Sequence, residues 1–273
     1  MPWGQIVGET IGALFQDAPY YIIKRTGSFV RWLFLKSKYN YAQIYSQDWN
    51  GRVGVLTILI IIFSIIGIKT KVFDPKKQTE NSKAEVMRLS SANELRNGDI
   101  IFQTSLSRQS KAIQLATHSK YSHCGIIFKE GNSYYVFEAI QPVKKTPLAN
   151  WIARGEDGHF VVKRLTNANE ILKEDILANM ENIGERFKGK DYDLGFDWSD
   201  DKIYCSELVW KIYYRATGLE VGELQKLNDF DLSAPIVKRK LKERYGENIP
   251  MNESVISPAS IFESNLLTLV ITD

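Results

Sequence analysis

Two apolar runs near the middle of the chain are separated by a short polar loop. The first run is Tyr121–Phe128 (YSHCGIIF) and the second is Tyr134–Ile140 (YYVFEAI), with Lys129–Asn132 (KEGN) between them. Both runs are rich in the aromatic and β-branched residues that strands favour. A short loop that contains glycine and asparagine is typical of a hairpin. The sequence therefore predicts a β-hairpin, which commits this part of the chain to an antiparallel sheet.

The register of this hairpin decides which polar side chains meet. If the loop is centred on Glu130–Gly131, His123 lies opposite Glu138, and directly opposed Cβ atoms are about 4.5–5.5 Å apart. Any loop with an even number of residues keeps His123 and Glu138 on one face, whereas an odd loop separates them. Glu138 by itself indicates little, because a glutamate is also common at the solvent-facing positions of an alternating strand. The same alternation places Cys124 on the opposite face, as a core residue.

A cysteine stands at the expected start of a helix in Tyr204–Trp210 (YCSELVW). Helical spacing puts one set of side chains on a common face, namely Cys205, Val209, Ile212 and Ala216. Thr217–Gly218 is a helix-stop signal. A thiol at a helix N-terminus lies near the positive end of the helix dipole, which lowers its pKa and makes it a nucleophile. The alternative for Cys205 is a buried core cysteine.

Several kinds of site are excluded. The three histidines and two cysteines of the chain show neither zinc-ligand spacing nor a CxxC pattern. A net charge of +3, without a basic block interleaved with aromatic residues, argues against nucleic-acid binding. There is no glycine-rich phosphate loop after a strand, and the aspartates between Asp191 and Asp201 lack EF-hand spacing. We expect no metal, no cofactor, no nucleic-acid partner and no Cys124–Cys205 disulfide.

The remainder of the second half contains both strand and helix patterns, and we expect an α+β domain. Short apolar runs predict strands at Ile100–Phe102, His159–Leu165 and Leu266–Ile271. Apolar stripes and end signals predict helices at Ser107–Thr117, with Ser107 as the N-cap, Glu174–Phe187 and Pro235–Tyr245.

The first 84 residues differ in character from the rest. Residues 1–50 mix aromatic and aliphatic residues with Lys and Arg, which suits either a membrane surface or an amphipathic helix packed on a partner. The run Val53–Ile68 carries no charge and is flanked by Arg52 and Lys69, so we predict a transmembrane helix over residues 51–70. A polar segment predicts a linker over residues 71–84, and the folded domain spans residues 85–273. Positive charges on both sides of the run leave its orientation open.

Cys205, His123 and Glu138 are the residue types of a thiol triad. In such a triad the thiolate attacks a carbonyl carbon, and the imidazole holds the proton and returns it to the leaving group. The carboxylate orients the imidazole through its other nitrogen. Backbone N–H groups at the start of the helix can stabilise the oxyanion.

The order of these motifs resembles the YiiX/YebB-like family of NlpC-type cysteine hydrolases. The resemblance extends from about residue 85 to residue 270 and rests on Leu95–Phe102, Ser119–Ile127, Glu138–Ala139 and Tyr204–Val209. It implies a circularly permuted papain-like fold with an antiparallel sheet, in which the histidine strand precedes the nucleophile helix. It also implies Cys205 as nucleophile, His123 as base and Glu138 as the third member. We expect Tyr204, the residue before the nucleophile, to bind substrate.

Three functions follow from the triad and the resemblance. The first is a single-pass, membrane-anchored cysteine hydrolase that cleaves an amide or peptide bond of a bacterial envelope substrate through a thioester. The second is a thiol acyltransferase or lipid hydrolase that uses the same triad on an acyl-lipid substrate. The third is a non-catalytic binding module. A polar cleft at Cys205 favours the first function, and an apolar groove favours the second.

Overall fold

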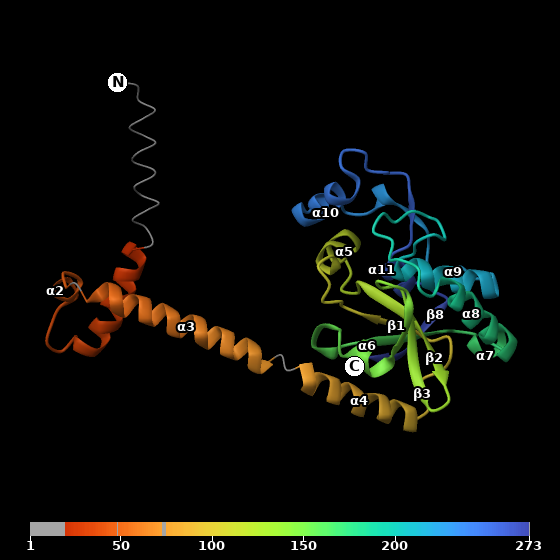
Figure 1. Ribbon diagram of the computed structural model, residues 1–273, viewed down its shortest axis with the longest axis horizontal. Coiled ribbons are helices and arrows are strands. Elements are labelled where there is room, and N and C mark those ends of the chain that lie inside the picture. Colours follow the sequence, from red (N-terminus) through yellow and green to blue (C-terminus); the bar gives the residue numbers. More distant parts are fainter. Residues whose placement is uncertain (1–19, 48, 73–74, 273) are drawn as a thin grey trace, which may run out of the picture. The chain divides into compact units, whose positions relative to one another are not determined.

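The computed structural model describes residues 20–47, 49–72 and 75–272 (Figure 1). The chain divides into two compact units, Met1–Asp74 and Pro75–Asp273. Each unit has its own packing, and the second contains all the residues of the predicted triad.

The second unit is built on a six-stranded sheet with the order β4-β3-β2-β1-β5-β8, in which every neighbouring pair is antiparallel. Its strands are β1 (Ile100–Gln103), β2 (His123–Glu130), β3 (Ser133–Glu138), β4 (Lys144–Pro147), β5 (Val161–Leu165) and β8 (Leu267–Thr272). The predicted strands in the regions of β1, β2, β3, β5 and β8 are confirmed. The short and polar strand β4 was not predicted.

Helices cover both faces of this sheet (Figure 1). On one face, α8 (Glu174–Phe187) and α9 (Cys205–Thr217) share a core with side chains such as Ile100, Phe102 and Ile126. On the other face, α4 (Pro75–Ser91) and α6 (Leu148–Ile152) share a second core with Ile101, Ile127 and Val162. Successive side chains of each strand therefore point into two separate hydrophobic cores, one on each face of the sheet.

The other elements of the second unit are short connections and one peripheral group. They are α5 (Ser110–Thr117), η1 (Glu156–Gly158), α7 (Ala168–Ile171), β6 (Gln225–Lys226), η2 (Leu227–Asp229), α10 (Pro235–Tyr245), β7 (Ser254–Val255) and α11 (Pro258–Phe262). The helix predicted from Ser107 begins instead at Ser110, with Gln109 as an N-cap whose side chain does not cap the helix. That side chain is engaged elsewhere, in the site described below.

The hairpin register differs from the predicted one by two residues. Glu130 pairs with Ser133, so the loop is Gly131-Asn132, and Gly131 adopts the left-handed conformation (φ 59°) that such a tight turn needs. The loop still has an even number of residues. His123 and Glu138 are therefore not directly opposite one another, but they remain on the same face, as predicted.

The prediction of a linker over residues 71–84 is wrong from residue 75 onward, where α4 begins. This helix is strongly polar, which is why it reads as a linker, but Leu89 is fully buried in the second core. Gln78 Nε2 also donates to the carbonyl oxygen of Gly155 at 3.0 Å. A few tertiary contacts thus stabilise a helix that its own apolar pattern does not indicate.

The first unit contains a helix over residues 20–35, α2 (Tyr41–Tyr45) and α3 (Asn50–Val72). The backbones of the first helix and α3 lie close together at Gly54. A Cβ atom at this position would lie only 1.9 Å from the carbonyl oxygen of Ile23, so no larger residue fits there without a shift. Helix α3 spans the range predicted to cross a membrane. Within the described part of the chain, however, no helix is both long and apolar enough to do so, and the structure does not support that prediction.

Candidate active site

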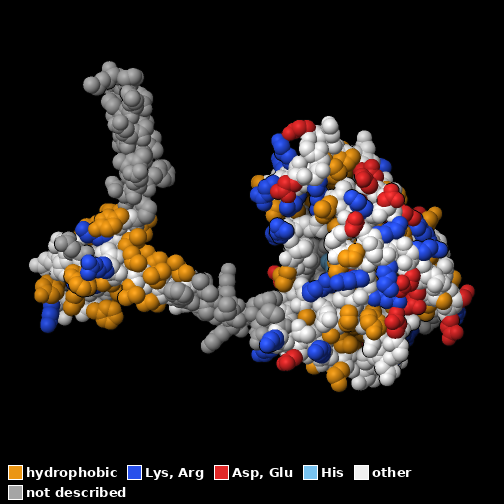
Figure 2. All heavy atoms as spheres, viewed as in Figure 1, with side chains coloured by type: hydrophobic (Ala, Val, Ile, Leu, Met, Phe, Trp, Pro, Cys, Tyr) orange, Lys and Arg blue, Asp and Glu red, His pale blue; other side chains and the backbone are white. Residues whose placement is uncertain are grey.

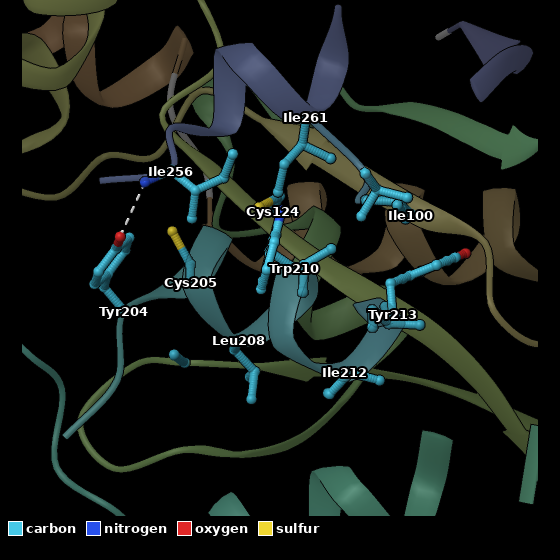
Figure 3. Packing of buried hydrophobic residues seen from close by; sticks show 14 of the residues in the cluster. Ile100, Cys124, Tyr204, Cys205, Leu208, Trp210, Ile212, Tyr213, Ile256 and Ile261 are labelled. Atoms are coloured by element: carbon cyan, nitrogen blue, oxygen red, sulfur yellow. Dashed lines mark hydrogen bonds between the residues drawn. The ribbon is translucent and has the colours of Figure 1, made fainter. Parts of the chain in front are cut away.

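Cys205 is the first residue of α9, as predicted, and Gly218 ends the helix in the left-handed conformation. The apolar side of the helix, including Leu208, Val209 and Ile212, is fully buried against the sheet (Figure 3). This packing fixes the helix axis. It places the thiol at the N-terminal end of the helix, where unpaired backbone N–H groups and the positive end of the dipole favour a negative charge.

The start of α9 is tied to the segment around Ile256 by two hydrogen bonds. Ser206 Oγ donates to the carbonyl oxygen of Ile256 at 2.8 Å. The N–H of Ile256 donates to the Tyr204 hydroxyl at 3.1 Å (Figure 3). Tyr204, predicted to bind substrate, is only 2% exposed and engages its hydroxyl within the protein. Its substrate-binding role stays a prediction, whereas its contacts position the nucleophile.

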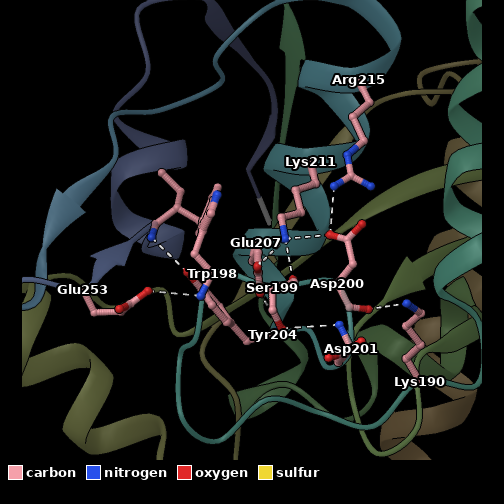
Figure 4. Close-up of polar contacts among 11 residues, drawn as sticks. Lys190, Trp198, Ser199, Asp200, Asp201, Tyr204, Glu207, Lys211, Arg215 and Glu253 are labelled. Carbon is pink, nitrogen blue, oxygen red and sulfur yellow. Dashed lines mark hydrogen bonds and ion pairs between the residues drawn. The ribbon is translucent and has the colours of Figure 1, made fainter. Parts of the chain in front are cut away.

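A charged cluster fastens the aspartate-rich loop to the flank of α9 (Figure 4). Asp200 Oδ1 pairs with Lys211 at 2.9 Å and with Arg215 at 2.8 Å, and Lys211 also pairs with the buried carboxylate of Glu207 at 2.7 Å. Burial raises the pKa of Glu207 to about 8, although Lys211 opposes the shift. The loop that precedes Cys205 is therefore held in place by ion pairs to the helix that follows it.

His123 is held by a carboxylate on the neighbouring strand. Its Nε2 lies 2.7 Å from Glu138 Oε2, and its ring stacks on Trp151 with 5.8 Å between the ring centroids. Glu138 is completely buried and its Oε1 accepts hydrogen bonds from Thr146 at 2.6 Å and Arg154 at 2.5 Å. Because Nε2 faces Glu138, the ring nitrogen left for the thiol is Nδ1.

Each partner stabilises the charged form of the others. Burial raises the pKa of Glu138, but hydrogen bonding and charge from His123, with help from Arg154 and Thr146, outweigh burial and lower it to about 2. Burial likewise lowers the pKa of His123, but hydrogen bonds and charges from Cys205 and Glu138 raise it to about 9. The imidazole is thus a cation at neutral pH, between two anionic neighbours.

The sulfur of Cys205 is the third member of this chain. The neighbouring Cys124 thiol and the positive charge of His123 hold the pKa of Cys205 well below its usual range, although burial opposes the shift. These shifts favour a thiolate on Cys205 beside an imidazolium on His123, which is the reactive form of a cysteine nucleophile. The structure brings together all three residues predicted for the triad.

Cys124 has a second role beside its predicted place in the core. It is fully buried, faces α9 and, like Cys205, is a free thiol. Burial, with the neighbouring Cys205 in the same direction, raises the pKa of Cys124 well above its ordinary value, which favours the neutral thiol. The strand alternation explains this placement. His123 and Cys124 are the first two residues of β2, so their side chains lie on opposite faces of the sheet.

Sequence reasoning missed two sets of residues around the triad. Thr146 and Arg154, which bond Glu138, come from β4 and from the end of α6, and neither element carries a strong pattern. Tyr192 and Gln109 line the same cavity as Cys205, and Gln109 Nε2 donates to the Tyr192 hydroxyl at 3.1 Å. Tyr192 lies in the aspartate-rich loop before the nucleophile, where the sequence pattern was interpreted only from the spacing of its carboxylates.

A narrow cavity of about 90 Å³ opens beside the thiol of Cys205. Most of its wall is apolar and comes from α5, α10 and the segment after β7, with Ala112, Ile113, Ala116, Val237, Leu241 and Val255 among its lining residues. The polar side chains in the wall include Gln109, Tyr192 and Arg244. The nucleophile therefore faces an apolar pocket that carries a few polar groups.

No group of three or more His, Cys, Asp or Glu side chains within the described ranges is arranged to hold a metal ion. Near the thiol, His123 and Glu138 are bonded to each other.

Comparisons with known proteins agree with the fold. A family model described as a permuted papain-like amidase enzyme, YaeF/YiiX, C92 family, matches residues 94–271. A protein of Escherichia coli (strain K12) named "Uncharacterized protein YiiX" is 54% identical over 173 residues, which are 63% of this chain and 84% of that protein. A crystal structure described as the metalloprotein YiiX from Escherichia coli O157:H7 is 52% identical with a TM-score of 0.63, covering 66% of this chain and 98% of that one.

Proposed function

The chain belongs to the YaeF/YiiX family of permuted papain-like amidases and is a cysteine hydrolase, and from this we propose that it cleaves an amide bond through a thioester on Cys205. The observation that carries the proposal is the position of His123, which is bonded through Nε2 to a buried carboxylate and whose pKa is raised by Cys205 at the start of α9 as well as by Glu138. A non-catalytic module has no need of a buried thiolate–imidazolium pair, which is costly to keep in a protein interior.

In the proposed reaction, the Cys205 thiolate attacks the carbonyl carbon, a C–S bond forms and the carbonyl π electrons move to oxygen. The C–N bond then breaks, and the leaving nitrogen takes the proton that His123 carries. Water next loses a proton to His123 and attacks the thioester, and the C–S bond breaks to release the acid and the thiolate. Glu138 remains a carboxylate throughout and keeps the imidazole in its orientation.

This proposal predicts a trapped acyl-enzyme. Rapid mixing with p-nitrophenyl acetate followed by acid quench is expected to give a burst of p-nitrophenol and an acetyl adduct that peptide mass spectrometry assigns to Cys205. A burst is expected because an activated ester acylates a thiolate faster than water cleaves the thioester. An adduct on another residue, or none above a denatured control, would contradict the proposal.

The apolar wall of the cavity favours a second candidate function, the hydrolysis or transfer of an aliphatic acyl chain. Side chains such as Ile113, Val237 and Leu241 line the space that begins at the nucleophile. An acyl chain bound there would place its carbonyl carbon at the sulfur and bury its methylene groups, each worth about 0.8 kcal/mol. A peptide substrate offers no such gain unless it presents an apolar side chain.

A series of p-nitrophenyl esters separates the two candidates. If the cavity binds an acyl chain, kcat/KM for butyryl and hexanoyl esters rises above that for the acetyl ester by roughly fourfold per methylene group. Ala116→Phe, which fills the cavity, removes this rise and leaves acetyl ester hydrolysis within about twofold, and Ala84→Phe on the exposed side of α4 is the matched control. A rate that is flat or falls with chain length would favour the peptide or amide substrate.

We also propose that the first unit associates with a membrane, which is the role predicted for residues 1–70. Its support is a set of exposed apolar side chains, for example Phe34 (83% exposed) and Ile60 (57% exposed), that Figure 2 shows in orange over this unit. Arg25 and Arg52 lie over the rings of Tyr21 and Trp49, an arrangement suited to the boundary between lipid and water.

The membrane proposal predicts that the full chain sediments with vesicles of anionic phospholipid. The double variant Phe34→Glu, Ile60→Glu is expected to shift most of the protein to the supernatant, since two buried charges oppose insertion. Phe230→Glu, in the second unit, controls for a general effect of added charge. Recovery of the unaltered chain in the supernatant at low salt would rule the association out.

A further inference from the structure

The loop that follows α6 supplies a second cation to the carboxylate of the triad. Arg154 Nη2 lies 2.5 Å from Glu138 Oε1, whereas His123 faces the other oxygen, Oε2. The Glu138 side chain is fully buried, and the Arg154 side chain is 41% exposed. A guanidinium group does not lose its proton in a protein, so Arg154 is a cation at every stage of a reaction. The charge of His123, in contrast, changes whenever it gives or takes a proton.

This loop is packed against the end of the strand pair that carries His123. Gly155 approaches the side chain of Gln103 so closely that a Cβ atom on the glycine would lie 2.4 Å from Gln103 Oε1. Gln103 is the residue of β1 directly opposite His123. The N–H of Glu156 also donates to the carbonyl oxygen of Thr104 at 3.0 Å. The backbone of the loop is therefore held beside the histidine from the side of the sheet.

Helix α4 holds the same loop from another side. Gln78 Nε2 donates to the carbonyl oxygen of Gly155 at 3.0 Å, the residue that directly follows the arginine. At the other end of α4, Leu89 is buried in one core with Trp151 of α6, whose ring stacks on that of His123. The helix therefore contacts both the loop that carries the arginine and the helix that carries the stacked ring.

We propose that Arg154 is a positioning residue that keeps Glu138 charged and in place through the whole catalytic cycle, and that Gln78 is a positioning residue that holds the loop of Arg154. This role rests on the proposed function. His123 is a cation in the resting site and becomes neutral when the leaving nitrogen takes its proton. A buried carboxylate without a cation is strongly disfavoured. At that stage Arg154 is the cation that stays on Glu138, until water gives a proton to the imidazole.

Helix α4 lies outside residues 94–271, the part of the chain that the family model matches. It nevertheless belongs to the same compact unit as the triad. The support of the triad in this chain therefore includes a helix that precedes the matched region.

Arg154→Met tests the first part of the proposal. Without the guanidinium group, the Glu138 anion is less stable, so this carboxylate takes up a proton at higher pH. The acid limb of kcat/KM for p-nitrophenyl acetate is therefore expected to move to higher pH, with the rate near pH 4 about tenfold lower relative to that at neutral pH than in the wild type. The alkaline limb is not expected to move to lower pH, since the loss of a positive charge does not destabilise the imidazolium. This pattern differs from the one expected for the loss of the carboxylate itself.

A conservative variant and a matched control accompany this measurement. Arg154→Lys keeps a positive charge and is expected to return the acid limb most of the way to its wild-type position. A role in folding alone would lower the temperature of thermal unfolding without moving the acid limb. Arg88→Met is the control, because it removes an exposed arginine of α4 that also pairs with glutamates, Glu85 and Glu94. Its acid limb is expected to coincide with that of the wild type.

Gln78→Ala tests the part given to α4. The loop then loses one hydrogen bond, so kcat at neutral pH is expected to fall about threefold with KM nearly unchanged. The acid limb is expected to move in the same direction as in Arg154→Met, by a smaller amount. Met87→Ala, which truncates a side chain of the same helix that is 70% exposed, is the matched control.

The outcomes separate this inference from the proposed function. If the unaltered protein forms no acyl-enzyme on Cys205, the proposed function fails. If it does, and the acid limb of Arg154→Met coincides with that of the wild type, only the role of Arg154 is refuted. If Gln78→Ala has the same kcat and the same acid limb as Met87→Ala, the role of α4 is refuted.

Discussion

Replacing Cys205 by alanine is expected to abolish acyl transfer, with kcat/KM for an activated ester or amide falling on the order of 10⁴–10⁶-fold. The reason is that no other nucleophile stands at this position. Cys124, the nearest thiol, is fully buried, and its raised pKa keeps it protonated. The backbone N–H groups at the start of α9 remain, so some rate above that of water persists. The measurement is steady-state hydrolysis of p-nitrophenyl acetate.

Two further variants sharpen this prediction. Cys205→Ser keeps the shape of the site but supplies a hydroxyl that His123 does not deprotonate in the resting state, so it is expected to be nearly as inactive as Cys205→Ala. Cys124→Ala is the matched control: it removes a donor to the thiolate, raises the pKa of Cys205 and leaves the nucleophile in place. Turnover that survives in Cys205→Ala but disappears in Cys124→Ala would refute the assignment.

Glu138→Gln is expected to reduce kcat about 10²–10⁴-fold, because an amide can present its NH₂ group to Nε2 and so hold the imidazole in the wrong tautomer. It also removes the anion that supports the imidazolium. His123, with a pKa of about 9, loses its proton as the pH rises, and this sets the alkaline limb of activity. Without the carboxylate the pKa of His123 falls, so the alkaline limb of kcat/KM is expected to move to lower pH.

The same substitution has a stability readout with a defined sign. Glu138 has a folded-state pKa of about 2, below the usual 4.5, so its contribution to stability is present above about pH 4.5 and is lost as the pH falls toward 2. The shift corresponds to roughly 3 kcal/mol. Glu138→Gln is therefore expected to unfold at a lower temperature than the wild type at neutral pH, with a smaller difference in strong acid. Glu130→Gln, an exposed carboxylate of the same hairpin, is the control. An unmoved alkaline limb would contradict the role given to Glu138.

Short-range patterns were sufficient to predict the elements that carry the triad. The spacing of Cys205, Val209 and Ile212, with Gly218 beyond them, predicts α9 with its correct ends. The hairpin pattern predicts that His123 and Glu138 share a face, because that depends only on whether the loop length is even. The register itself was wrong, since the position of the turn depends on which residue adopts a left-handed conformation. Gly131 takes that position, so the loop is centred one residue later than the predicted centre at Glu130–Gly131.

What the sequence did not indicate depends on contacts between distant segments. The sequence of helix α4 predicts a linker because most of its residues are polar. The helix is held to the domain by a few buried side chains such as Leu89. Cys124 follows the alternation into the core, but only the docking of α9 brings it against Cys205. The hydrogen bonds of Gln109 to Tyr192 and to Arg244 join residues 83 and 135 positions apart. No local period relates such residues, so their meeting appears only in the folded chain.

The pH dependence of alkylation of Cys205 by iodoacetamide tests the central claim, a thiolate–imidazolium pair, most directly. The structure predicts that the rate is already near its maximum at neutral pH, well below the usual cysteine pKa of about 8.5, with the adduct on Cys205. It also predicts that His123→Ala moves the rise to higher pH, since the positive charge that stabilises the thiolate is gone. A rate that rises only around pH 8.5 in both proteins, or an adduct on Cys124, would contradict the pair and with it the proposed catalysis.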